Sequence, residues 1–197
     1  MAIGPTHPRV RVARALAESL LAELPDRWAH TVGVARRAEE LAGTVDPADR
    51  VVLVVAAWLH DIGYGGAVAD TGFHPLDGAR YLEWHGWPRR VTALVAHHSG
   101  AEFLARAQGL DAELARYPRE ESPVADALAY ADQTTGPTGD RVTVEERLAE
   151  VLVRHGPGSA HARAHRLRGP YLLEVGERVE RRLRGATAEA MALAARS

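Results

Sequence analysis

The stretch DPADRVVLVVAAWLHDIG, residues 46–63, decides the fold that we predict for this chain. Asp46 is of a residue type that caps helices, and Pro47 follows it at the first helical position, where proline is favoured. The run Val51–Val55 that follows is apolar on every side, which suits either a buried strand or a buried helix. The flanking alanines, the cap and the length to about residue 61 favour a helix at the centre of the molecule.

Most of the chain on both sides of this helix shows the helical period. We predict further helices over 8–24, 27–42, 75–86, 88–98, 101–116, 122–132, 143–155 and 159–184. Glycine-rich residues 63–73 and turn-rich residues 134–140 predict loops, and a small-residue tail is expected after Gly185. Without strand-like alternation or an internal repeat, we expect an all-α protein. A single domain over 1–197 would carry a C-terminal helical extension after about residue 141.

Composition narrows the classes of function. The net charge of -2 provides no basic surplus for nucleic-acid binding. The chain has no cysteine, so a metal would bind through nitrogen and oxygen, and it has no lysine. Arg11, Arg14 and Glu18 interrupt the apolar residues near the N-terminus, which indicates an amphipathic helix and not a signal peptide. No apolar run is long enough for a membrane span, and a cytoplasmic location is the default expectation.

His60-Asp61 ends the most apolar predicted helix, and this context distinguishes it from a chance dipeptide. A solvated helix end would not need so apolar a helix. A metal site does need one, because its ligands must be held rigidly in a dry environment.

Further histidines and an aspartate lie where buried side chains are expected. His30 shares a helix stripe with Val34 and Leu41, His74 precedes Pro75, and Asp132 continues the stripe of Val124 and Leu128. His97 and His98 end another apolar helix. Taken singly, each permits a structural interpretation, such as a hydrogen-bonded core histidine. Together they indicate a metal site, because imidazole and carboxylate groups suit Fe, Mn, Zn, Co or Ni, and Mg where carboxylates dominate.

These residues resemble the HD superfamily of metal-dependent phosphohydrolases. The family pattern His…His-Asp…Asp falls on His30, His60-Asp61 and Asp132, and HDIG stands at 60–63. FHPLDGARYL at 73–82 and HHSG at 97–100 are similar to the family's blocks for a second metal. RWAHTVGVARRAEELAG from residue 27 and YAD at 130–132 are similar to bacterial HD-type diadenosine tetraphosphate hydrolases. Tyr64 stands where many relatives have lysine.

The resemblance implies an HD-domain helical bundle with its core at about 27–135 and a C-terminal helical extension at about 141–185. It also implies one or two divalent metal ions, of Fe, Mn, Co, Ni, Zn or Mg. The first would be held by His30, His60, Asp61 and Asp132. The second would be held by Asp61 as a bridge, His74, His97 and His98.

The leading hypothesis is hydrolysis of a phosphoester or phosphoanhydride in a nucleotide or small phosphorylated metabolite. Asp61 would orient a metal-activated water. Arg80 is a candidate catalytic and substrate contact, with an exposed surface arginine as the alternative. Thr134 and Arg141 are candidate substrate contacts, with turn capping and surface ion pairing as alternatives. A small phosphorylated molecule is the expected partner, without nucleic acid or membrane, and a homodimer is allowed.

Two rivals remain. Some members of the superfamily are mixed-valent diiron oxygenases that use four histidines and two aspartates, one histidine fewer than this chain offers. The other rival is a non-catalytic nucleotide-binding module, which predicts lost ligands. The remaining histidines of the C-terminal helices, His155, His161 and His165, are expected on a solvated face beside several arginines.

Overall fold

The computed structural model describes residues 7–194, and this part of the chain is all-α, as the sequence predicts. In chain order the elements are α1 (Pro8–Leu21), α2 (Pro25–Glu40), η1 (Leu41–Thr44), α3 (Arg50–Leu59), η2 (Ile62–Tyr64), α4 (His74–Trp84), α5 (Arg89–His97), η3 (His98–Gly100), α6 (Ala101–Gln108), α7 (Asp111–Leu114), α8 (Pro123–Gln133), α9 (Val144–His155) and α10 (Ala160–Ala194), where η marks a 3-10 helix. Between residues 7 and 194 the only β-type pairing is an isolated bridge from Thr135 to Arg141.

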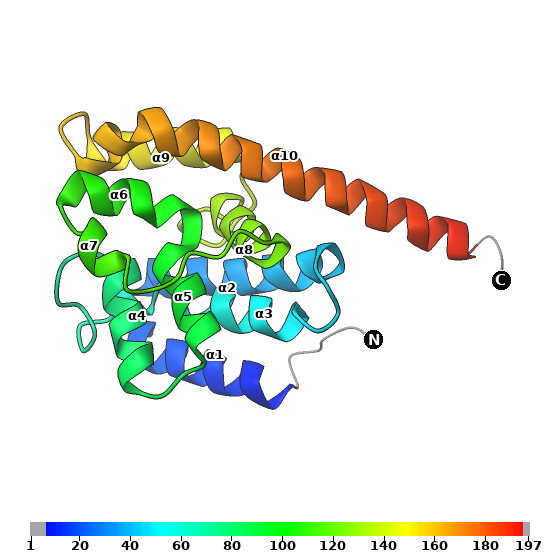
Figure 1. The fold of residues 1–197 in the computed structure, drawn as a ribbon, viewed down its shortest axis with the longest axis horizontal. Helices are drawn as coiled ribbons and strands as arrows, with labels where there is room; N and C mark the ends of the chain where they lie inside the picture. The colour runs from blue at the N-terminus through cyan, green and yellow to red at the C-terminus, as the bar shows by residue number, and fades with distance from the viewer. Residues whose placement is uncertain (1–6, 195–197) are drawn as a thin grey trace.

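Helix α3 forms the centre of the bundle, with α1, α2, α5 and α8 packed around it (Figure 1). Leu53–Leu59 are all buried. A helix that is apolar on every side has no face for solvent, so it is stable only when other helices cover it. Helix α3 begins at Arg50 and not at Pro47. Asp46 Oδ1 accepts from the Ala48 amide at 2.9 Å and so belongs to the turn that precedes the helix.

Two further predicted boundaries were wrong. The helix expected over 101–116 is divided into α6 and α7 at Gly109, whose φ of 74° is left-handed and ends α6. The tail expected after Gly185 is the last part of α10, which continues to Ala194. Alanine, glutamate, methionine and leucine dominate that segment and are strong helix formers, so an existing helix extends through it.

Helices α9 and α10 cover the upper side of the bundle. Helix α10 packs on α6, α8 and α9, and its C-terminal part extends beyond the other helices (Figure 1). Helix α10 also contacts η3, the short helix that begins at His98.

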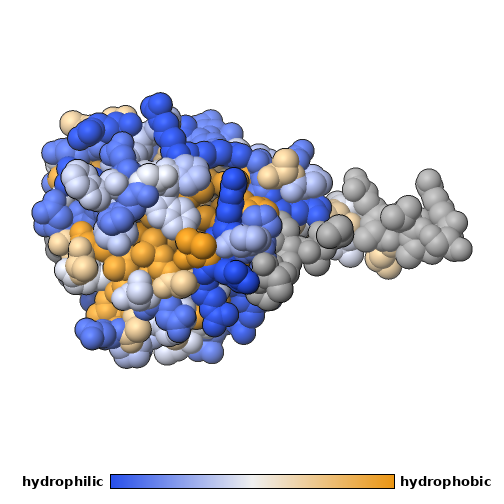
Figure 2. All heavy atoms as spheres, turned by 90° about the horizontal axis from the view of Figure 1, so that it is seen from below, coloured by the Kyte–Doolittle hydropathy of each residue, from blue (hydrophilic) through white to orange (hydrophobic). Residues whose placement is uncertain are grey.

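The surface adds two observations. No helix in the described chain combines the length and apolarity that a bilayer crossing requires. Seen from the α1 side, the surface has an exposed apolar region (Figure 2). Residues of α1, α3 and the start of α5 line an apolar groove of about 320 Å³, among them Val12, Val52 and Trp87.

The central position of α3 predicts a large cost for shortening one of its side chains. Leu53 is fully buried, so Leu53→Ala should lower the free energy of unfolding by about 2–5 kcal/mol, measured by urea denaturation. Val153→Ala is the control, because Val153 is 84% exposed and should change it by less than about 0.5 kcal/mol. Equal effects for the two variants would contradict the central role of α3.

Candidate metal centre

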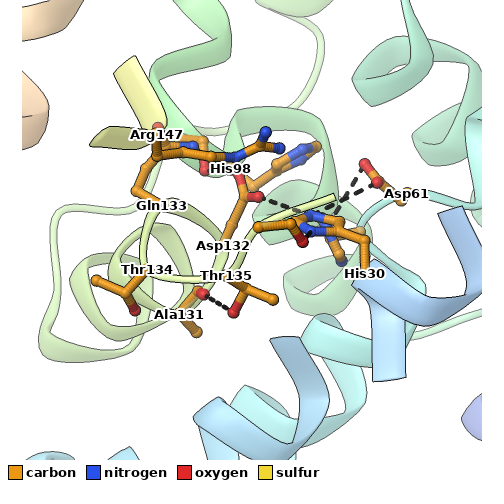
Figure 3. A network of polar contacts seen from close by, with 12 residues as sticks. His30, Asp61, His98, Ala131, Asp132, Gln133, Thr134, Thr135 and Arg147 are labelled. Carbon is orange, nitrogen blue, oxygen red and sulfur yellow. Dashed lines mark hydrogen bonds and ion pairs between the residues drawn. The ribbon is translucent and has the colours of Figure 1, made fainter. Parts of the chain in front are cut away.

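Three buried side chains from three helical elements form a first group of possible ligands. His30 lies on α2, His60 follows the last residue of α3, and Asp132 lies near the end of α8. One ligand atom from each lies within 4.8 Å of the others. His30 Nε2 lies 3.0 Å from Asp132 Oδ1. Figure 3 shows His30 pointing toward both Asp132 and Asp61.

A second group adjoins the first and consists of Asp61, His74 and His98, again with ligand atoms within 4.8 Å of one another. His74 begins α4, and His98 follows α5. The His74 Nε2 atom lies 3.2 Å from Asp61 Oδ1 and 3.2 Å from His98 Nε2. The rings of His60 and His98, one from each group, have centroids 5.2 Å apart.

Asp61 lies between the two groups. Its Oδ1 is 3.5 Å from His60 Nε2 and 3.2 Å from His74 Nε2, and its Oδ2 is 3.9 Å from His30 Nε2. The carboxylate thus faces imidazoles of both groups, which is the position that a bridging ligand requires.

Backbone carbonyls fix the tautomer of three of these histidines. The Nδ1 atoms of His30, His60 and His98 lie 3.0, 2.8 and 2.7 Å from the carbonyl oxygens of Gly136, Ala57 and Val95. A carbonyl only accepts, so each Nδ1 must carry the proton and donate it. The Nε2 lone pairs are then left facing the cluster, as in metal-binding histidines whose other nitrogen is held by the protein.

The unprotonated Nε2 atoms make the residues fit a cation. His60 Nε2 is buried and has no hydrogen-bond partner among the described residues. His98, His74 and Asp61 place one possible ligand atom each within 4.8 Å of one another. Buried polar atoms without partners are costly, and a divalent ion would satisfy all of them together.

Burial and neighbouring charges adjust the protonation of the ligands. Burial lowers the pKa of His60 and His98 and lowers that of His74 to about 4, which favours neutral imidazoles. Burial opposes ionisation of Asp61, but the adjacent His60, His74 and Arg27 hold the pKa of its carboxyl well below its usual range. For Asp132, the adjacent His30, His60 and Arg147 together outweigh the same effect of burial and hold the pKa of its carboxyl well below its usual range. Neutral imidazole and ionised carboxylate are the forms that bind metal.

A strained turn after α5 holds Asp132 in place. Ser99 has a φ of 52°, which is left-handed and uncommon for a residue other than glycine. This conformation directs its hydroxyl to donate to Asp132 Oδ2, and Gln133 Nε2 donates to the same oxygen at 2.9 Å. The turn thus links α5 to α8 at the cluster, and backbone strain of this kind is typical of functional sites.

Gly63 allows the second group to form. A Cβ atom at this position would lie 2.0 Å from the carbonyl oxygen of His74 and 2.8 Å from the amide of Gly78. Only glycine lets η2 approach the start of α4 this closely, and the approach places His74 beside Asp61.

The structure does not bring His97 to the cluster. It is the last residue of α5, and its Nε2 donates to the Tyr117 carbonyl at 2.8 Å. Of the seven metal ligands predicted from the sequence, the other six come together. The helical phase could not separate His97 from His98, because the backbone leaves the helix at His98, where ψ is 147°.

The predicted substrate contacts also lie elsewhere. Arg80 pairs with the exposed Asp70 at 3.2 Å, away from the pocket beside Asp61. Thr134 donates to the Tyr130 carbonyl at 2.6 Å at the end of α8, and Arg141 pairs with Glu40. Thr134 and Arg141 line a separate groove. These contacts match the turn-capping and surface-pairing alternatives considered for the same residues.

The pocket beside the cluster is lined by cationic and polar residues that the sequence analysis did not assign to it. They are Arg27, Tyr64, Ser99, Gln133, Arg147, Arg154, His155, His161 and Arg168. His155 is exposed, as expected for a solvated face, whereas His161 is only partly exposed, and their rings stack with centroids 3.9 Å apart. Contacts between helices distant in sequence place the residues of α9 and α10 here, so the local pattern carried no signal for them.

Arg27 and Tyr64 form the wall nearest to Asp61. Arg27 Nη1 donates to Asp61 Oδ2 at 3.1 Å, and its guanidinium lies 4.1 Å from the centroid of the Tyr64 ring. That ring stacks on His74 with centroids 4.0 Å apart. Tyr64 thus packs against both the Arg27 guanidinium and the His74 imidazole.

Comparison with known proteins gives one match. The family model of the HD domain matches residues 27–136, more than half of the chain. Neither the curated proteins nor the solved structures contain a match.

The role of Gly63 can be tested with a matched pair of glycines. Gly63→Ala should displace His74 and lower the metal-to-protein ratio of the purified protein, measured by inductively coupled plasma mass spectrometry. Gly66→Ala is the control, because its Cβ would meet nothing within 4 Å. If Gly63→Ala retained as much metal as Gly66→Ala, the second group would not depend on this close approach.

Proposed function

The chain belongs to the HD domain family, and we propose that it is a metal-dependent phosphohydrolase. The observation that carries the proposal is the pair of adjoining ligand groups, His30–His60–Asp132 and Asp61–His74–His98, beside a pocket lined by four arginines. Its substrate would be a phosphoester or phosphoanhydride of a nucleotide or another small phosphorylated metabolite. The metal would be Fe, Mn, Co, Ni, Zn or Mg.

The ligand set suits one or two divalent ions. When bound, such ions supply an activated water and polarise a phosphoryl group. Asp61 is placed to orient the attacking water, because its carboxyl group faces both ligand groups. Arg27 holds that carboxyl in position through its hydrogen bond, and Ser99 and Gln133 do the same for Asp132.

The charge of the pocket supports a phosphorylated substrate. Arg27, Arg147, Arg154 and Arg168 line it, against the two carboxylates Asp61 and Asp132. Phosphoryl transfer accumulates negative charge on the phosphoryl oxygens, and fixed cations stabilise it. The narrower resemblance to diadenosine tetraphosphate hydrolases remains a prediction about the substrate.

A diiron oxygenase is the second candidate, and one observation favours it. The sequence offered one histidine more than the four that the resemblance implies for such enzymes. With His97 bound to the Tyr117 carbonyl, the six clustered residues are four histidines and two aspartates. The number of histidines therefore does not favour hydrolysis over oxygenation. The argument for hydrolysis is the set of arginines that line the pocket.

The test of the proposal is a screen of phosphoesters and nucleotides with protein loaded with Mn, Fe, Co, Ni or Mg, in air and under anaerobic conditions. We expect phosphate release that does not require O₂. Turnover that requires both O₂ and iron would favour the oxygenase. Bound metal with neither activity would favour a non-catalytic module.

Asp61→Ala should abolish both metal retention and phosphate release, because this carboxylate contacts ligands of both groups. Metal content and phosphate release would be measured on the same preparation. Asp70→Asn is the control, since Asp70 is exposed and lies outside the pocket. Wild-type turnover in Asp61→Ala would end the proposal.

His74→Ala removes a ligand from the second group only. We expect the protein to keep the ion held by His30, His60 and Asp132 and to lose any ion held by Asp61, His74 and His98. Titration of the chelated variant with Mn²⁺ in a calorimeter would give the number of sites. Two retained ions would contradict the assignment of two separate groups.

A further inference from the structure

The C-terminal helices bring an excess of positive charge to the pocket. Arg147 and Arg154 come from α9, and Arg168 comes from α10. All three lie outside residues 27–136, the segment that the family model matches. The excess therefore belongs to a part of this chain that family membership does not describe.

Carboxylates neutralise only part of this charge. Arg27 pairs with Asp61 at 3.1 Å. Arg147 and Arg154 share a single carboxylate, Glu150, and Arg147 Nε is buried without a partner in the described chain.

Arg168 is the clearest example of positive charge that no carboxylate of the described chain neutralises. It is 8% exposed, and its Nε donates to the Ser99 carbonyl at 2.8 Å. No carboxylate whose side chain the structure describes forms an ion pair with it. Arginine stays protonated in proteins, and a buried charge without a counter-ion is costly. Burial accordingly lowers the pKa of this guanidinium.

The position of Arg168 links it to the ligand cluster. Ser99 accepts from Arg168 through its backbone carbonyl and donates to Asp132 through its side chain. Both Arg168 and Arg147 line the same pocket as Asp61, His74 and His98. The unneutralised guanidinium therefore faces a space next to the proposed reaction centre and not a separate surface.

From this placement we infer that Arg168, with Arg147 and Arg154, forms a second anion-binding subsite for a phosphoryl group adjacent to the one at the metal centre. The substrate class is then a phosphoanhydride, in which one oxygen joins two phosphoryl groups. The inference rests on the proposed phosphohydrolase function and specifies its substrate.

Ser99 limits the distance between the two groups. It contacts Arg168 through its carbonyl and Asp132 through its hydroxyl, so a second anionic group at Arg168 must follow the first closely. Directly linked phosphoryl groups meet that condition. The guanidinium is suited to the role, because it donates in a planar fork that matches two phosphate oxygens.

The test compares two ligands that cannot be hydrolysed: methylphosphonate, with one phosphonate group, and methylenediphosphonate, with two. Binding to Mn²⁺-loaded protein would be measured by calorimetry. Arg168→Gln should weaken methylenediphosphonate binding by about ten- to hundred-fold and change methylphosphonate binding by less than about threefold. Equal losses for both ligands, or no loss for either, would overturn the second subsite.

Two further variants separate binding from a structural role. Arg166→Gln is the matched control, because Arg166 is exposed on the same helix. It should leave both affinities unchanged. Arg168→Lys keeps the charge without the fork, so methylenediphosphonate affinity should fall between those of wild type and Arg168→Gln. If Arg168→Gln fails to fold, the lysine variant decides: an unchanged ratio of the two affinities would overturn the inference.

The shift in melting temperature caused by methylenediphosphonate gives a second readout. Arg168→Gln should reduce this shift. A purely structural arginine would instead lower the melting temperature of the free protein and leave the shift unchanged, which would contradict the subsite.

Failure of the inference and failure of the proposed function give different results. If wild type binds methylenediphosphonate through Arg168 but hydrolyses no phosphorylated compound, the subsite stands and the proposed hydrolase falls. If the protein hydrolyses phosphomonoesters and Arg168→Gln binds both ligands as wild type does, the hydrolase stands and the subsite falls.

Discussion

The structure depends on how the backbone holds three imidazoles at the centre of the bundle. Carbonyl oxygens of Gly136, Ala57 and Val95 accept from Nδ1 of His30, His60 and His98, and this directs three Nε2 lone pairs toward one another. Such an arrangement is unfavourable in a dry protein unless a cation fills it. The apolar helix α3, the strained turn at Ser99 and the close approach at Gly63 all keep these groups together.

Much of this arrangement could be predicted from the sequence, because local patterns determine it. The apolar run before His60 specified the central helix, and the helical period placed His30 and Asp132 on buried faces. His97 and His98 could not be separated, since adjacent residues each continued a plausible stripe. The choice is made by the left-handed turn at Ser99, which directs the chain out of α5 and into α6.

The arginines show where local patterns fail. Arg80 is near His74 in sequence but pairs with Asp70, whereas Arg147 and Arg168 are distant in sequence and line the pocket. Their positions follow from the packing of α9 and α10 on α8 and of α10 on η3, which no single helix encodes. The possible metal ligands lie within residues 27–136, and three of the four arginines of the pocket lie on α9 and α10. Such a pocket would combine a reaction centre shared with the family and a substrate preference specific to this chain.

Anomalous X-ray diffraction from crystals soaked in Mn²⁺ tests the central claim most directly. The account predicts an anomalous peak in contact with His30, His60 and Asp132, with the Nε2 atoms as ligands, and a second peak beside Asp61, His74 and His98 if two ions bind. The absence of any peak at these residues, with ordered water bonded to His60 Nε2 instead, would contradict it.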